Sequence, residues 1–209
     1  MMRIALAFFA ASLAATIPPP AAAGVSLGLS AADGVAVHGE LWRAAGARPP
    51  IVLAFHQAGS SSAEYAPIAP RLVQAGFTVL AIDQRSGDGE FGGSNRTATA
   101  LGREASFEEA LPDLNAALDW AKANAHGAPV IVWGSSYSAA LVFLLAAARP
   151  QDVAAVVAYS PGEYLADRSA VRNAARKVRV PVFIDQASGT DEIEQSAAIL
   201  GALPGSDKQ

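Results

Sequence analysis

The sequence predicts an α/β fold, with a mostly parallel sheet that carries helices on both faces. Short continuous apolar runs, typical of strands buried on both faces, recur at 51–55, 77–82, 129–133, 153–159 and 180–184. Helical stretches lie between and after them, at 64–74, 107–124, 139–148, 168–177 and 191–200. Because strand and helix alternate, the crossovers should be right-handed and the sheet parallel.

The composition agrees with one globular domain. Of the 209 residues, 52% are hydrophobic and 16% are charged, and the formal net charge is −4. A chain this apolar can bury a core, and its mild acidity gives no electrostatic reason to expect a nucleic-acid partner. The absence of cysteine excludes disulfides, thiolate nucleophiles and cysteine-ligated zinc.

The first element, residues 1–23, predicts a secretory signal peptide. A basic start at Arg3 is followed by an apolar run over 4–17, three prolines and three alanines. An A-x-A site of this kind predicts cleavage after Ala23, which would leave 24–209 periplasmic or secreted. The apolar run is shorter than the roughly 20 residues of a spanning helix, which favours a cleaved signal over a membrane anchor. An uncleaved anchor is the alternative. After cleavage we expect no membrane span.

A β-hairpin is expected next. Apolar and polar residues alternate from Val25 to Arg43 around the turn sequence Ala32-Asp33-Gly34. The apolar runs that follow supply the parallel strands, and ligands of such sheets bind at the carboxyl ends of the strands. Side chains just after each run are therefore functional candidates. Asp83 and Arg85, which follow the run 77–82, are expected to form a local ion pair.

The run 129–133 continues into Gly134-Ser135-Ser136-Tyr137-Ser138 and then into a helix. This G-x-S-x-S turn is a close variant of the G-x-S-x-G nucleophile elbow, where small flanking residues allow a sharp turn that lifts the serine hydroxyl to a helix N-terminus. We predict that Ser136 is a nucleophile. The alternative is a turn in which Ser135 or Ser136 only caps the helix.

A second loop, His56-Gln57-Ala58-Gly59, follows the run 51–55. Acyl transfer needs an N–H donor on a loop that faces the nucleophile, so that the oxyanion lies between two donors. We assign the oxyanion hole to the N–H groups of Ala58 and Tyr137, with Gln57 as the fallback for Ala58. His56 is expected to hold this loop through a side-chain hydrogen bond.

These motifs resemble the α/β-hydrolase family, and within it the small dienelactone-hydrolase-like and serine esterases. The resemblance covers about 35–203 and rests on the segments that begin at His56, Asp83, Gly134 and Val180. Dienelactone hydrolases proper use a cysteine nucleophile, so Ser136 fits the serine esterases better. The resemblance implies hydrolysis of small carboxylic esters without a metal or organic cofactor.

The resemblance also implies an acid after the run 180–184. Asp191 is the residue that fits, with Asp185 and Glu192 as alternatives, and the simpler interpretation is that Asp191 caps the following helix. Only one helix fits between the last two apolar runs, so the site should lack a lid. Its walls are expected to include aromatic side chains, which are Tyr65, Phe91 and Tyr164.

The family order of the triad is serine, acid, histidine, and no histidine follows Asp191. His38 lies in the hairpin, His56 in the oxyanion loop, and His126 at the far end of the strand that leads to Ser136. We therefore expect an exported serine esterase, impaired because the triad histidine, the last strand and the last helix are missing from this chain. The alternative is a truncated or non-catalytic relative.

Overall fold

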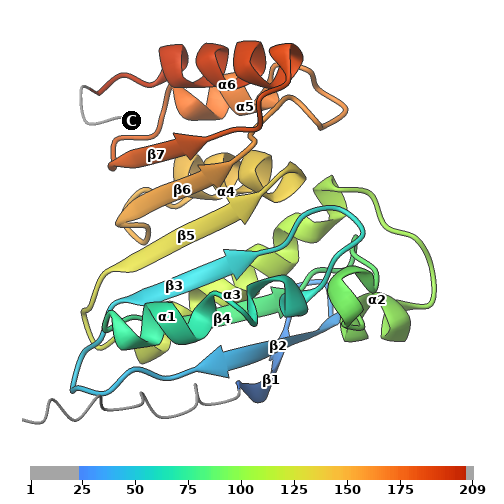
Figure 1. Ribbon diagram of the computed structural model, residues 1–209, viewed down its shortest axis with the longest axis vertical. Helices are drawn as coiled ribbons and strands as arrows, with labels where there is room; N and C mark the ends of the chain where they lie inside the picture. The colour runs from blue at the N-terminus through green and yellow to red at the C-terminus, as the bar shows by residue number, and fades with distance from the viewer. Residues whose placement is uncertain (1–23, 206–209) are drawn as a thin grey trace, which may run out of the picture.

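The computed structural model describes residues 24–205 (Figure 1). The predicted signal peptide lies outside the described residues and stays a prediction. The described chain forms a seven-stranded sheet in the order β1-β2-β4-β3-β5-β6-β7. Strands β1, β2 and β4 pair antiparallel in that order, whereas every other neighbouring pair is parallel. The predicted α/β fold with a mostly parallel sheet is confirmed.

The strands are β1 (Val25–Ser30), β2 (Ala36–Trp42), β3 (Ile51–Phe55), β4 (Thr78–Asp83), β5 (Val130–Ser135), β6 (Ala155–Tyr159) and β7 (Val182–Asp185). The α-helices are α1 (Ala69–Gln74), α2 (Arg96–Leu101), α3 (Leu111–Asn124), α4 (Tyr137–Ala148), α5 (Ala170–Ala175) and α6 (Thr190–Ala202). Three short 3₁₀ helices are η1 (Ser62–Tyr65), η2 (Glu90–Gly92) and η3 (Glu108–Ala110).

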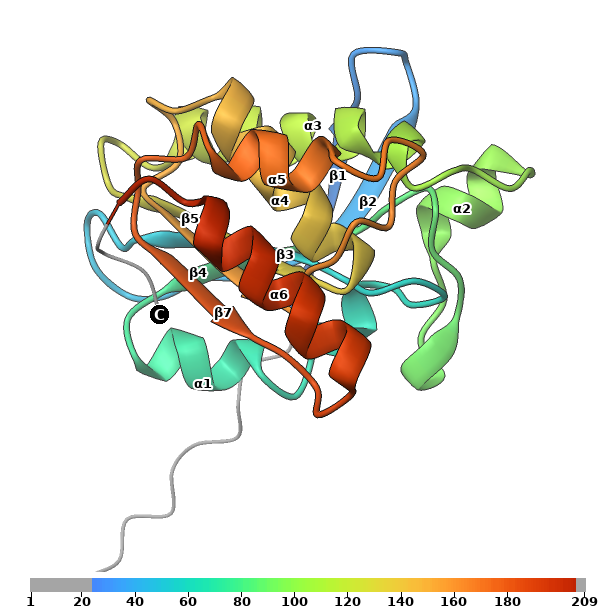
Figure 2. The same ribbon diagram turned by 90° about the horizontal axis from the view of Figure 1, so that it is seen from above.

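Helices lie on both sides of the sheet, as expected. Figure 2 shows α1 on one side and α3, α4 and α5 on the other, while α6 runs beside β7 at the end of the sheet. The larger hydrophobic cluster fills the space under α3 and α4 and includes Leu53, Leu118 and Phe143. A smaller one lies under α1 around Val52 and Val79. Strands β3 and β4 are buried along their whole length, which explains their continuous apolar sequences.

One helical prediction was wrong in detail, and one helix was missed. The stretch 64–74 is not one helix, because prolines interrupt it: η1 ends before Pro67, and α1 accommodates Pro70 only in its first turn. Helix α2 was not predicted, since it is a single six-residue segment. It is defined by its ends, where the side chain of Asn95 accepts the Ala98 N–H at 2.8 Å and Gly102 takes a left-handed φ of 69°.

No helix within residues 24–205 is long and apolar enough to cross a membrane. Within the described residues, α6 follows β7. That the family's last strand and last helix are missing from this chain stays a prediction.

Candidate active site

Ser136 occupies the turn between β5 and α4 in a strained backbone conformation, with φ 55° and ψ −123°. Its N–H donates to the carbonyl of Tyr159 on β6 at 2.8 Å, so the turn is tied to the neighbouring strand. A Cβ on Gly134 would lie 2.4 Å from the backbone oxygen of Ser138, so only glycine fits before the turn. A left-handed serine that its surroundings hold in place is typical of a functional site.

The two predicted oxyanion donors carry free N–H groups. Tyr137 is the first residue of α4, so its N–H has no acceptor inside the helix. Within the part of the chain that the structure describes, neither the Tyr137 nor the Ala58 N–H donates to a protein acceptor. The fallback donor is occupied, because the Gln57 N–H donates to Glu64 Oε2 at 2.9 Å. The loop therefore leaves the N–H of Ala58 available to a ligand.

Glu64 is a site residue that the sequence analysis missed. Its carboxylate lies against the oxyanion loop, where it accepts the Gln57 N–H and approaches the hydroxyls of Ser60 and Ser135. Burial raises the pKa of this carboxyl, and the negative charge of Glu90 adds to the rise, while the hydrogen bond from the Gln57 N–H and the nearby hydroxyls oppose it. Glu64 fixes the loop that presents Ala58. No sequence pattern marks it, because its partners come from β5 and from the loops after β3 and β4.

The side chains that follow Ser136 anchor the start of α4 to the neighbouring loops. The Tyr137 hydroxyl accepts hydrogen bonds from Gln84 Nε2 at 2.9 Å and from Ser86 Oγ at 2.8 Å. Ser138 Oγ donates to the carbonyl of His56 at 2.6 Å. Burial raises the pKa of the Tyr137 hydroxyl, so it stays protonated. These bonds fix the position of the Ser136 turn relative to the ends of β3 and β4.

His56 holds the oxyanion loop, as expected. Its ring is fully buried, with Nδ1 2.7 Å from the carbonyl of Gln57 and Nε2 accepting the Gln84 N–H at 3.0 Å. The Gln84 bond requires Nε2 to be unprotonated, so Nδ1 carries the hydrogen. Loss of hydration on burial lowers the pKa of His56 to about 4. The imidazole is therefore neutral at pH 7, and both of its nitrogens are occupied.

Acidification from pH 6.5 to pH 4 is expected to lower the free energy of unfolding by about 3 kcal/mol through His56. The unfolded chain binds a proton near the ordinary histidine pKa, whereas the folded chain binds it only near 4, so the His56 contribution is present above pH 6.5 and is lost as pH falls. Urea unfolding at stepped pH measures this loss. His126→Gln, on the exposed turn before β5, should keep the loss and His56→Gln should remove it; a parent protein with flat stability over this range would contradict the prediction.

The three candidate acids lie in different surroundings. Asp191 is exposed in the first turn of α6, and its carboxylate makes no hydrogen bond to any described residue. Asp185 ends β7, where its carboxylate accepts the N–H of the next residue at 3.1 Å. Glu192 is half-buried, and its charge, after burial itself, raises the pKa of Tyr164, a tyrosine whose hydroxyl lies beside Ser136. Glu192 is thus linked to the surroundings of the nucleophile through Tyr164.

The expected aromatic walls are only partly present. Tyr164 is half-buried, and its hydroxyl donates to the carbonyl of Ser160 at 2.9 Å. Tyr65 is a core residue instead, because it is buried and donates to the carbonyl of Phe55 at 2.8 Å. The side chain of Phe91 lies outside the described residues.

The predicted Asp83–Arg85 ion pair does not form. Asp83 pairs with Arg96 at 3.0 Å, and Arg85 pairs with Asp113 at 2.7 Å and with Asp33. The correction has a geometric reason: at the end of β4, Asp83 faces η1 and α2, whereas Arg85 faces α3 and the β1–β2 turn.

A cavity of about 500 Å³ opens beside the oxyanion loop. Gly59 of that loop lines it together with Ser86, which contacts the Tyr137 hydroxyl, and with Arg103. Among residues 24–205, no three histidine, aspartate or glutamate side chains gather as a metal site would require.

A strained serine between a parallel strand and a helix, at the carboxyl edge of a mostly parallel sheet, is the arrangement of α/β hydrolases. The chain belongs to the α/β-hydrolase family described as serine aminopeptidase, S33, whose family model matches residues 47–197. The expected family is therefore confirmed. No curated protein matches the sequence.

Solved esterase structures share this fold. A cold-adapted esterase from an Arctic intertidal metagenomic library has a TM-score of 0.69 and 21% identity, over 88% of this chain and 81% of that one. The dienelactone hydrolase of Anabaena variabilis has a TM-score of 0.69 and 23% identity, over 88% and 83%. A carboxyl esterase from Bacillus coagulans reaches 0.57 at 18% identity, and the match covers 68% of this chain but only 45% of that enzyme. At these identities the likeness establishes the fold alone.

Proposed function

We propose that the protein is an exported serine hydrolase that cleaves carboxylic esters through an acyl-enzyme on Ser136. The observation that carries the proposal is the left-handed backbone of Ser136 at the start of α4, with a free N–H on Tyr137 directly after it. The esterases among the structural neighbours support the choice of substrate class.

In this mechanism Ser136 Oγ attacks the ester carbonyl, and the N–H groups of Ala58 and Tyr137 bind the oxyanion. The alcohol leaves, and water then releases the acyl group from Ser136. Asp191 remains our proposed triad acid, which would orient the imidazole that takes the serine proton. Glu64 acts indirectly, because it holds the loop that carries the Ala58 donor.

We further propose that none of the three histidines in these 209 residues is the triad base. Both ring nitrogens of His56 are engaged in the core, His38 belongs to β2, and His126 lies in the turn before β5, opposite to Ser136. Loss of the triad histidine from a serine hydrolase lowers kcat by roughly 10⁶, and the oxyanion hole and substrate binding still supply about 10³ over water. The chain as given is then an impaired enzyme.

A second candidate, a non-catalytic relative, is favoured by the same lack of a histidine beside Ser136. Hydrolysis of p-nitrophenyl acetate separates the two functions. We expect turnover of this ester above the buffer rate but far below that of a complete triad. Release of p-nitroaniline from an amino-acid p-nitroanilide should be no faster than release of p-nitrophenol from the ester. A rate equal to buffer would favour the non-catalytic relative. A rate typical of complete triads would refute the missing base, and preference for the anilide would make the enzyme a peptidase.

A further inference from the structure

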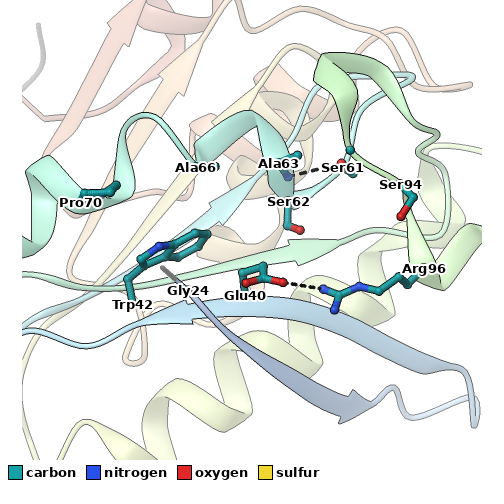
Figure 3. Close-up of a pocket in the computed structure, with 11 residues that line it drawn as sticks. Gly24, Glu40, Trp42, Ser61, Ser62, Ala63, Ala66, Pro70, Ser94 and Arg96 are labelled. Atoms are coloured by element: carbon teal, nitrogen blue, oxygen red, sulfur yellow. Dashed lines mark hydrogen bonds and ion pairs between the residues drawn. The ribbon is translucent and has the colours of Figure 1, made fainter. Parts of the chain in front are cut away.

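A cavity of about 550 Å³ lies apart from the proposed active site, between β2, η1 and the start of α2 (Figure 3). None of its lining residues belongs to the Ser136 turn or to the loop 57–60. Glu40 and Trp42 of β2 line one side, and Ser62 and Ala63 of η1 line the other. The first described residue, Gly24, also lines this cavity, next to Trp42 and Glu40 (Figure 3).

Gly24 packs so closely that no other residue fits without a shift. A Cβ built on Gly24 would lie 2.7 Å from Trp42 Cε2 and 2.8 Å from Glu40 Oε2. The backbone nitrogen of Gly24 is bonded to the same α-carbon, so it too lies near the indole ring and the carboxylate. Any charge on this nitrogen therefore interacts electrostatically with the Glu40 carboxylate.

Within residues 24–205, one oxygen of Glu40 has no hydrogen-bond partner. Oε1 is approached by Ser26 Oγ at 3.4 Å and by Arg96 at 3.5 Å. Oε2, which faces Gly24, accepts no hydrogen bond from any residue in 24–205. Arg96 does not neutralise Glu40 fully, because its closer ion pair, at 3.0 Å, is with the fully buried Asp83. The carboxylate thus lacks a cation on the side where Gly24 lies.

We propose that this cavity holds the N-terminus of the processed protein, as an ammonium on Gly24 paired with Glu40 Oε2. Hydrolysis of the Ala23–Gly24 peptide bond adds one water, leaves a carboxylate on Ala23 and an amine on Gly24, and the amine takes up a proton at neutral pH. The new cation supplies the partner that Glu40 lacks and lies close to the Trp42 indole. Export processing thereby completes an ion pair that the uncleaved amide cannot make. This inference is independent of ester hydrolysis.

The first test is the N-terminus of protein exported by a bacterial host. Edman sequencing or intact mass should show a chain that begins at Gly24. Any other first residue, or an uncleaved chain, overturns the proposal.

The second test compares this exported protein with the same protein acetylated on the Gly24 nitrogen. At pH 7 acetylation should lower Tm by about 2 °C, because it removes a partly buried ion pair. Glu40→Gln should remove this difference, whereas Glu194→Gln, an exposed carboxylate on the distant α6, should leave it. No loss on acetylation, or an equal loss in Glu40→Gln, overturns the proposal.

The pH dependence gives a further check. Glu40 on β2 and Arg96 on α2 are the charged side chains of the cavity wall, and η1 and α1 contribute only serine, alanine and proline. The carboxylate should hold the pKa of the amino group above its ordinary value of about 8, so its stabilisation is present at lower pH and is lost as pH rises through the raised value. The Tm difference should therefore vanish at about pH 10, and a difference that persists there would overturn the proposal.

Discussion

Ser136→Ala is expected to abolish covalent labelling by a fluorophosphonate probe. The probe phosphonylates an activated serine oxygen, and Ser136 is the serine held in a strained turn directly before the free N–H of Tyr137. The N–H groups of Tyr137 and Ala58, our proposed oxyanion donors, should stabilise the charge that develops on the phosphonyl oxygen as they would an ester oxyanion. Labelling of the parent should be slow, because in our proposal no histidine of these 209 residues assists it, but it should map to the peptide that contains Ser136.

Ester turnover should respond much less than labelling to the same substitution. Triad members act as a unit, so once the base is lost, removal of the serine adds little further loss of kcat. We therefore expect p-nitrophenyl acetate turnover by Ser136→Ala within about tenfold of the parent. Ser188→Ala, an exposed serine between β7 and α6, is the matched control and should label as the parent does. Equal labelling of Ser136→Ala and the parent would show that the nucleophile is another residue.

Asp113→Ala is expected to lower the free energy of unfolding by about 3–5 kcal/mol. Asp113 is fully buried on α3, and its two oxygens accept from the Arg85 guanidinium at 2.7 Å and from the Arg85 N–H at 2.9 Å. Arg85 itself is only 3% exposed. Without Asp113, the guanidinium keeps only Asp33 as a partner, and the backbone N–H of Arg85 loses its acceptor. The loss of the buried partner of a buried charge is among the most costly point changes.

Urea unfolding measures this loss, and the same helix supplies a matched control. Asp119 on α3 pairs with Arg149 at 2.9 Å, but its side chain is 66% exposed. Asp119→Ala should therefore change stability by less than about 1 kcal/mol. The double variant Arg85→Met with Asp113→Leu should recover much of the loss, because it removes both charges together. A change below 1 kcal/mol for Asp113→Ala alone would contradict the prediction.

The fold was predictable because its signals are local. Strand β3 lies at the predicted residues, 51–55, since an uninterrupted apolar run between two prolines and a polar loop fits only a strand buried on both faces. The Ser136 turn was predictable for the same reason, because small residues around a serine at the junction of a strand and a helix are needed only where the backbone bends sharply. Helix α2 was missed because its six residues are too few to show a period.

The sequence alone therefore determined the mostly parallel sheet, the position of Ser136 and the loop that faces it. Tertiary structure decided which groups hold these parts in place. Arg85 contacts Asp113 and Asp33 rather than its neighbour Asp83, Glu64 takes the Gln57 N–H, and the first described residue meets Glu40. The physical reason is range: hydrophobic periodicity and turn strain arise among adjacent residues, whereas the partner of a buried charge or N–H is whichever group the packed chain brings within about 3 Å.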